Sequence, residues 1–322
     1  MTLFRTLASL AALSIFVQIV LGAVVRLTDS GLSCPDWPLC YGLWFPTPDK
    51  LAALPSVDYT FGQVMAEWTH RLNAAAVVSP LVLVLLVMAV RLRRSAPALL
   101  STMIAAAVVL LAQAGLGGFT VLDRNSPWSV AVHLSVALVL LALVLRARLI
   151  AESPTTGATG WTTARVFAAL SAVMVLVTVA SGAMMAKSGA SLACSTWPLC
   201  DGAVIPDLSD PGIRLHFGHR LLALGAGLGV IVTWLLARRT ALASSERPHP
   251  AANMALAIYI GQILIGAVVV YAFGGGSLWP QVAAGAFHQA VGVLLFATLV
   301  VMALHKSPTS PGVAEVENVA RT

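Results

Sequence analysis

Four histidines lie inside long apolar stretches of the chain and are the first candidates for chemistry. They are His70, His133, His219 and His288. A single histidine in a membrane span is commonly a hydrogen-bonded packing residue, but ionisable residues are costly there, and a repeated pair indicates function. Neutral imidazole is a good axial ligand for haem iron, and a flat porphyrin fits between apolar helices. The histidines therefore predict haem binding, whereas zinc or copper would need thiolate or more polar neighbours.

The residues around these histidines repeat, which indicates an internal duplication. Residues 30–40 read SGLSCPDWPLC, and residues 188–200 read SGASLACSTWPLC. Further on, residues 67–72 read EWTHRL, and residues 216–221 read HFGHRL. We expect two halves with the same membrane orientation, related by a two-fold axis along the membrane normal.

The duplication is broken at one position that can do chemistry. Glu67 stands three residues before His70, whereas His216 stands three residues before His219. Residues three apart share a helix face, so Glu67 can approach whatever His70 approaches, as a general base or by stabilising a developing cation. The alternative for Glu67 is an exposed carboxylate at a helix start. The role of His216 is open between a further ligand, a partner of a ligand and an interfacial residue.

All four cysteines lie in the repeated loops, as Cys34-x5-Cys40 and Cys194-x5-Cys200. An oxidising outer compartment permits disulfides, and the repeated spacing favours pairing within each loop. A thiol-redox pair or a metal site is the alternative, but redox pairs are usually Cys-x2-Cys, and no histidine lies between the cysteines. We predict two structural disulfides, with a redox role for the first pair left open.

Two further patterns accompany the histidines. Arg71 and Arg220 directly follow two of them and are candidates for pairing with haem propionates; the alternative is an interfacial arginine that reaches towards water. A polar residue also stands one turn before a glycine in four apolar stretches, at Gln18/Gly22, Gln113/Gly117, Thr178/Gly182 and Gln262/Gly266. This spacing favours close helix crossing with an interhelical hydrogen bond.

Composition indicates the elements that position these residues. Of the 322 residues, 58% are hydrophobic and 10% are charged, and a bilayer core needs roughly 20 apolar residues per helix. Eight stretches qualify, near 7–27, 68–90, 99–122, 128–149, 164–186, 215–237, 252–273 and 281–304. We predict an all-α integral membrane protein with eight transmembrane helices in two tandem, pseudo-two-fold-related four-helix bundles. The predicted domains are residues 1–155, residues 156–305 and a disordered cytoplasmic tail at 306–322.

The basic residues predict the orientation of the chain in the membrane. They gather in alternate loops, as at Arg91, Arg93 and Arg94, whereas the other loops are richer in Asp. Since cytoplasmic loops retain Lys and Arg, both termini should be cytoplasmic and the histidines should lie towards the outer face of the cell membrane. Arg5 before the first stretch is also typical of a signal peptide, but the length of that stretch and its place in the duplication favour a helix. The net charge of +6 fits the loop bias, and no basic stripe indicates a nucleic-acid partner.

Taken together, the Cys-x5-Cys loop ending in Trp-Pro-Leu-Cys, the Glu-x2-His-Arg-Leu motif and the second histidine of each half resemble the haem A synthase family over residues 10–304. The resemblance implies an oxidoreductase that converts the C8 methyl group of haem O to a formyl group, giving haem A for cytochrome oxidase. In that family the residues matching His219 and His288 hold a haem b cofactor. Those matching His70 and His133 bind the substrate haem.

The resemblance also assigns the family's essential carboxylate to Glu67 and its outer-loop cysteines to Cys34 and Cys40. The implied reaction is two successive oxidations of one methyl carbon, through an alcohol and a hydrated aldehyde. Two axial histidines saturate iron, which suits electron transfer better than dioxygen binding. Implied partners are haem O, the haem O-producing farnesyltransferase and cytochrome oxidase assembly factors. A homo-oligomer is compatible with the pattern, and the electron donor is unknown.

Three other functions use parts of the same residue set. A two-haem electron-transfer cytochrome would need the histidines but has no use for Glu67. An outer-face thiol oxidoreductase would depend on Cys34 and Cys40, and a haem carrier or assembly factor would need binding alone. The difference between Glu67 and His216 favours an enzyme in which one half performs chemistry.

Overall fold

The computed structural model describes residues 1–152, 161–244 and 250–305, and this part of the chain is helical without strands. Eight of its helical segments are long and apolar enough to cross a membrane, which confirms the predicted all-α membrane fold. The boundary between the predicted halves at residue 155 and the predicted tail at 306–322 lie outside the described residues.

The helices follow one another in the same order in each half of the chain. The first half contains α1 (Thr2–Leu27), α2 (Pro48–Ala52), α3 (Phe61–Asn73), η1 (Ala74–Val78), α4 (Ser79–Arg91), α5 (Pro97–Leu122) and α6 (Pro127–Glu152). The second half contains α7 (Thr163–Lys187), η2 (Ala190–Leu192), α8 (Pro211–Ser244), α9 (Pro250–Gly274) and α10 (Leu278–Leu304). The run α3, η1 and α4 forms one span, and α2 and η2 lie in the two long loops.

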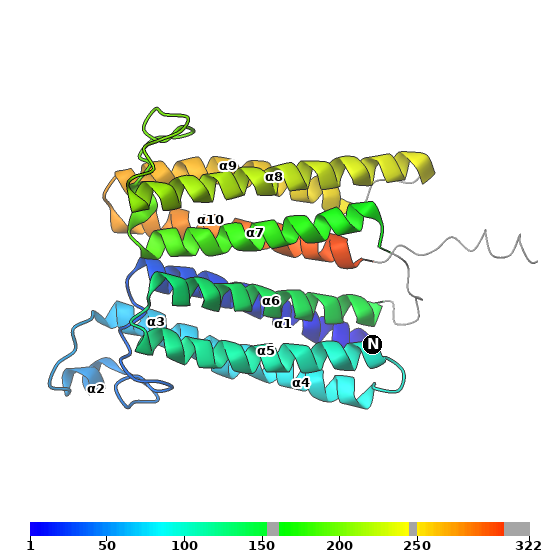
Figure 1. Ribbon diagram of the computed structural model, residues 1–322. Helices are drawn as coiled ribbons and strands as arrows, with labels where there is room; N and C mark the ends of the chain where they lie inside the picture. The colour runs from blue at the N-terminus through cyan, green and yellow to red at the C-terminus, as the bar shows by residue number, and fades with distance from the viewer. Residues whose placement is uncertain (153–160, 245–249, 306–322) are drawn as a thin grey trace, which may run out of the picture.

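The helices of each half pack mainly on one another. In the first half α1 contacts α3, α4 and α6, and α5 contacts α4 and α6. In the second half α7 contacts α8 and α10, and α9 contacts the same two helices. The halves meet where α6 lies against α7 and where α1 lies against α10, and the two long loops lie at the end of the molecule opposite the N-terminus (Figure 1). The two-fold relation between the halves stays a prediction.

Small residues fill the contact faces of α1. Ala8, Ala11 and Ala23 are fully buried there, together with Phe4 and Ile15. Lipid tails are as apolar as a helix surface, so helices in a membrane associate mainly by close packing, which alanine permits. The apolar core formed in this way continues across both halves and reaches Leu299 in α10.

The second span begins earlier than the sequence predicts, at Phe61 instead of residue 68. Thr60 and Gln63 form a capping box, in which Thr60 Oγ1 accepts from the Gln63 amide and Gln63 Oε1 accepts from the Thr60 amide. Hydropathy placed the start later because Gln63 and Glu67 interrupt the apolar residues of this segment. Glu67 and His70 therefore lie in the second and third turns of the helix, deeper than its start.

A π-helical turn interrupts the same span directly after the histidine. In η1, Ser79 Oγ donates to the carbonyl of Ala74 at 2.8 Å, five residues back. Pro80 follows and has no amide hydrogen to donate, which disturbs the α-helical bonding pattern of the preceding turn. The corresponding helix α8 is α-helical throughout its described length, so the two halves differ in backbone as well as in sequence.

Candidate functional site

His70 in α3 packs against the polar residue and the glycine of the motif in α1. Gln18 Nε2 lies 3.1 Å from Nδ1 and 3.2 Å from Nε2 of His70, and it donates to the His70 carbonyl at 3.0 Å. A Cβ on Gly22 would lie 3.1 Å from Cε1 of the imidazole. Asn73 Nδ2 donates to Gln18 Oε1 at 2.7 Å, which fixes the amide in turn. The ring is thus held by one helix at a position where only glycine leaves room.

The other three histidines are held in the same way by the helix that precedes theirs. A Cβ would lie 3.4 Å from Cε1 of His133 at Gly117, 2.9 Å from that of His219 at Gly182, and 3.3 Å from that of His288 at Gly266. The polar contacts are Gln113 Nε2 to His133 Nε2 at 3.3 Å, Ser181 Oγ to His219 Nδ1 at 2.9 Å, and Gln262 Nε2 to His288 Nε2 at 3.4 Å. The predicted close crossing is present at all four glycines, and its partner is in each case a histidine, which the sequence did not reveal. The interhelical hydrogen bond predicted for Thr178 is wrong, because Thr178 Oγ1 donates to the carbonyl of Met174 and Ser181 contacts His219 in its place.

A cavity of about 460 Å³ opens between the helices of the second half, within the size range of small-molecule sites. Both His219 and His288 line it, together with His216, Arg220 and Tyr259. Most of the remaining lining is apolar, as at Val179, Leu221, Val269 and Phe273. The structure thus brings the two predicted ligands of the second half to one cavity.

The residues present fit a haem with two histidine ligands. The Nδ1 atoms of His133 and His288 are buried and have no hydrogen-bond partner within the part of the chain that the structure describes. Of the two residues, His288 lines the cavity, and an unpaired buried nitrogen is costly unless a ligand satisfies it. In the first half, the matching glycine contacts hold His70 and His133, and that these two residues face one bound group stays a prediction.

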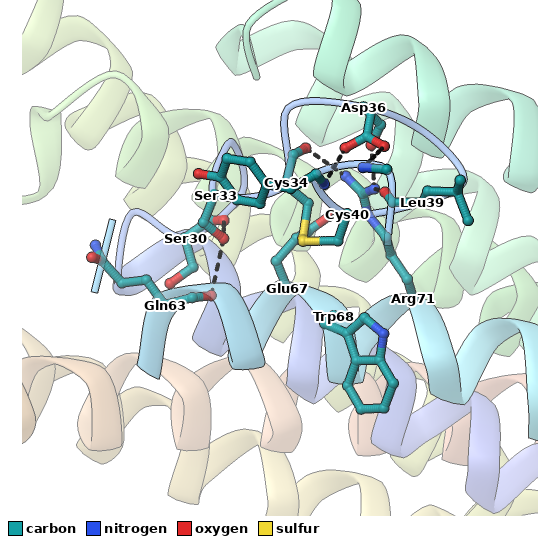
Figure 2. Close-up of a disulfide and its surroundings, with 12 residues drawn as sticks. Ser30, Ser33, Cys34, Asp36, Leu39, Cys40, Gln63, Glu67, Trp68 and Arg71 are labelled. Carbon is teal, nitrogen blue, oxygen red and sulfur yellow. Dashed lines mark hydrogen bonds and ion pairs between the residues drawn. A yellow bond between two sulfur atoms is a disulfide. The ribbon is translucent and has the colours of Figure 1, made fainter. Parts of the chain in front are cut away.

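In the first half, Glu67 forms a buried ion pair that continues into the first disulfide loop (Figure 2). Arg71 Nε donates to Glu67 Oε1 at 2.8 Å. The same guanidinium donates from Nη1 to the carbonyls of Asp36 at 2.5 Å and Leu39 at 2.6 Å, and from Nη2 to the carbonyl of Cys34 at 3.0 Å. Only 6% of Glu67 is exposed, so the alternative of an exposed carboxylate at a helix start is wrong.

Both predicted disulfides are present, between Cys34 and Cys40 and between Cys194 and Cys200. Each closes a loop that contains a cis peptide bond, Trp37–Pro38 in the first and Trp197–Pro198 in the second. The first tryptophan packs towards Gly118 in α5, and Trp197 lines the cavity of the second half. The loops thus lie directly over the helices that carry the histidines. A redox role for the first pair stays a prediction.

The second half repeats the arginine but replaces the carboxylate. Arg220 donates to the carbonyls of Cys194 at 3.1 Å, Thr196 at 2.9 Å, Pro198 at 3.2 Å and Leu199 at 3.0 Å. Arg71 and Arg220 therefore both fasten a disulfide loop to the helix below. The propionate contacts predicted for these two arginines stay a prediction. Most of the N–H donors of both side chains are hydrogen-bonded to carbonyls of the loops.

His216 is buried and lines the cavity, so it is not an exposed interfacial residue. Its Nδ1 lies 3.2 Å from the carbonyl of Ala190 and 3.3 Å from the amide of Cys194. Outside the membrane span, Ser195 donates twice to Asp201 Oδ1, at 2.9 and 2.6 Å, and these bonds hold the pKa of Asp201 below its usual range. An arginine thus fastens both loops, but its neighbour one turn earlier is the carboxylate of Glu67 in the first half and the imidazole of His216 in the second.

Two residues of the cavity were missed by the sequence reasoning. Arg26, in the last turn of α1, lines the cavity although it belongs to the other half of the chain. Gln289 directly follows His288 and accepts a hydrogen bond from Arg26 Nη2 at 2.7 Å. An arginine at the end of an otherwise apolar stretch was the available signal, but its neighbours depend on how the halves pack.

Comparison with known proteins shows the family to which the chain is related. A family model described as cytochrome oxidase assembly protein matches residues 5–300. Among curated relatives, a protein of Granulibacter bethesdensis named haem A synthase is 29% identical over 90% of this chain and 83% of its own length. Proteins of the same name are 26% identical in Geobacillus thermodenitrificans, over 97% and 96%, and 30% identical in Parvibaculum lavamentivorans, over 91% of each chain.

Proposed function

The chain belongs to the cytochrome oxidase assembly protein family, and we propose that it acts as a haem A synthase, oxidising the C8 methyl group of haem O to the formyl group of haem A. Relatives at 26–30% identity over most of the chain carry the name haem A synthase. The observation that carries the proposal is the buried Glu67–Arg71 pair beside His70. A protein that only transferred electrons or carried haem would gain nothing from burying an ion pair in one half alone.

The proposal divides the work between the halves. His70 and His133 hold the substrate, haem O, and His219 and His288 hold a resident haem b. The division is supported by the carboxylate, which one half has at Glu67 and the other replaces by His216. A group that reacts needs a proton acceptor nearby, whereas a group that only passes electrons does not.

In the substrate half, each residue has a definite task. Gln18 and Gly22 fix the imidazole of His70, so the substrate is held in one orientation and its reactive methyl group is presented reproducibly. Oxidation of a methyl to a formyl group releases protons, and Glu67 is the buried carboxylate placed to accept them. Arg71 keeps that carboxylate in position through a 2.8 Å hydrogen bond. When bound, haem b supplies one-electron redox chemistry to the second half.

The surroundings of the site complete the proposal. Arg71 and Arg220 fasten the two disulfide loops to α3 and α8, which carry His70 and His219. We place the protein in the cell membrane, with cytoplasmic termini and both haem sites towards the outer face, on the distribution of basic residues. Its substrate comes from the haem O-producing farnesyltransferase, and its product goes to cytochrome oxidase assembly.

The test is to express the chain together with a haem O-producing farnesyltransferase and to separate the haems extracted from the membranes. We expect haem A to accumulate, and the same strain without this chain to contain haem O and haem B only. If haem A is absent although the chain is present in the membrane with bound haem, the protein is a cytochrome or a haem carrier and the proposal is wrong.

A further inference from the structure

Arg26 reaches from the first half of the chain into the cavity of the second. It lies in the last turn of α1, and its side chain lines the cavity that contains His219 and His288. Its Nη2 donates to Gln289 Oε1 at 2.7 Å, and Gln289 Nε2 donates to the carbonyl of Ile19 at 3.0 Å. One end of the guanidinium is therefore bonded to Gln289, the residue that follows His288.

The charge of Arg26 is not balanced by the protein. Its Nε is buried without a hydrogen-bond partner, and no carboxylate in residues 1–152, 161–244 or 250–305 forms an ion pair with it. Arg26 is only partly exposed, and holding a cation largely away from water without a counter-charge is unfavourable. The geometry therefore points to a negative charge that arrives with the occupant of the cavity.

Arg26 also differs from the other arginine of the cavity in the donors that it has left. Arg220 donates four hydrogen bonds to carbonyls of the disulfide loop. Arg26 donates one, to a neutral amide. A guanidinium has five N–H donors in a planar fork suited to a carboxylate, so Arg26 is the better placed of the two to bind one.

The internal duplication shows that the Arg26–Gln289 hydrogen bond is not a general feature of how the two halves pack. Counted from the glycine that contacts the histidine, the position matching Arg26 in α7 is Ala186. Counted from the histidine itself, the position matching Gln289 in α6 is Leu134. The two halves meet at both helix pairs, yet the charged residue and its amide partner are found at one of them only. The arginine therefore serves the second cavity specifically.

We propose that Arg26 binds a propionate carboxylate of the haem held by His219 and His288. The inference rests on the proposed haem site of the second half. It makes the first half a part of that site, because the residue that neutralises the propionate comes from α1. A fixed positive charge beside a haem favours the reduced form, so Arg26 also raises the reduction potential of this haem.

The experiment compares three variants of the full-length chain purified with its haem. Arg26→Gln removes the positive charge. Arg26→Lys keeps the charge but loses the planar set of N–H donors that can bind a carboxylate through two hydrogen bonds. The matched control is Lys187→Met, because Lys187 also joins the halves, through an ion pair with Asp29 at 3.0 Å, but does not line the cavity. The measurements are the reduction potential, by spectroelectrochemical titration, the propionate bands in resonance Raman spectra, and haem retention on dilution.

We expect Arg26→Gln to lower the potential, shift the propionate bands and weaken haem retention by roughly tenfold or more, as the loss of a hydrogen bond to a charged group predicts. Arg26→Lys should shift the bands but keep most of the potential, and Lys187→Met should match the wild type in all three. Bands and potential unchanged in Arg26→Gln would overturn the inference while leaving the haem site intact. If Arg26→Gln does not fold, unshifted bands in Arg26→Lys overturn it instead. A wild-type protein without a bis-histidine haem spectrum would overturn the proposed site itself.

Discussion

Glu67 and Arg71 are joined by a 2.8 Å hydrogen bond between carboxylate and guanidinium, and Arg71 bonds in turn to the backbone on both sides of the Cys34–Cys40 disulfide. The carboxylate is therefore connected to the first disulfide loop through one side chain. A change in the loop and a change in the carboxylate should have related effects in the first half and little effect in the second.

The first prediction concerns the carboxylate itself. Glu67→Gln keeps the size of the side chain and removes its ability to accept a proton, so we expect formation of haem A to fall roughly a hundredfold or more. The absorbance of haem b should stay unchanged, because Glu67 lies in the other half. Extracted haems and visible spectra measure the two quantities. Asp49→Asn in α2, an exposed carboxylate, is the control, and full activity in Glu67→Gln would leave that residue without a catalytic role.

The second prediction compares the two arginines. Arg71→Met leaves the carboxylate of Glu67 buried without its partner, which should lower the free energy of unfolding by about 3 kcal/mol. Arg220→Met loses only hydrogen bonds to carbonyls that are partly exposed to water, so a loss of about 1 kcal/mol is expected. Thermal unfolding in detergent gives both values. The double variant Arg71→Met, Glu67→Gln should recover part of the loss, and no recovery would argue against the ion pair.

The third prediction uses the glycines that contact the histidines. A Cβ at position 182 would lie 2.9 Å from His219 Cε1, so Gly182→Ala must displace the imidazole. Overpacking of this kind costs about 1–3 kcal/mol, and haem b should be retained roughly tenfold less well. Gly115→Ala in α5, where a Cβ meets nothing within 4 Å, is the control. The ratio of haem to protein after purification measures the effect, and equal ratios in both variants would contradict it.

The fourth prediction separates the two disulfides. Replacing Cys34 and Cys40 by serine loosens the loop that Arg71 fastens, so formation of haem A should fall while haem b remains. Replacing Cys194 and Cys200 loosens the loop over the other cavity, so haem b itself should be lost more easily. Haem extraction and spectra of both double variants test this. The same loss in both would mean that the loops act on overall stability alone.

Much of the fold could be predicted from the sequence, because membrane spans are set by local composition. All eight spans follow from runs of apolar residues, and the disulfides follow from the repeated Cys-x5-Cys spacing. The start of the second span could not be found in this way, since Gln63 and Glu67 interrupt the apolar residues there and the helix start is fixed by the capping box.

The candidate site could be predicted only in part. The histidines and Glu67 were identified because ionisable residues in apolar stretches are rare. The contacts between the glycines and the histidines and the position of Arg26 in the cavity were missed. Both depend on which helices become neighbours, and local sequence patterns do not determine the packing of helices. The burial of Glu67 was open for the same reason: its partner Arg71 is one turn away, but the loop that covers both comes from residues 34–40.

The hydrogen bond between Arg26 and Gln289 also records something about the history of the chain. A gene that has just duplicated encodes two identical halves, either of which could replace the other. Here one contact between the halves has an arginine and a glutamine, and its counterpart has Ala186 and Leu134. Two copies of either half could not rebuild both contacts, so the two halves are unequal and depend on each other.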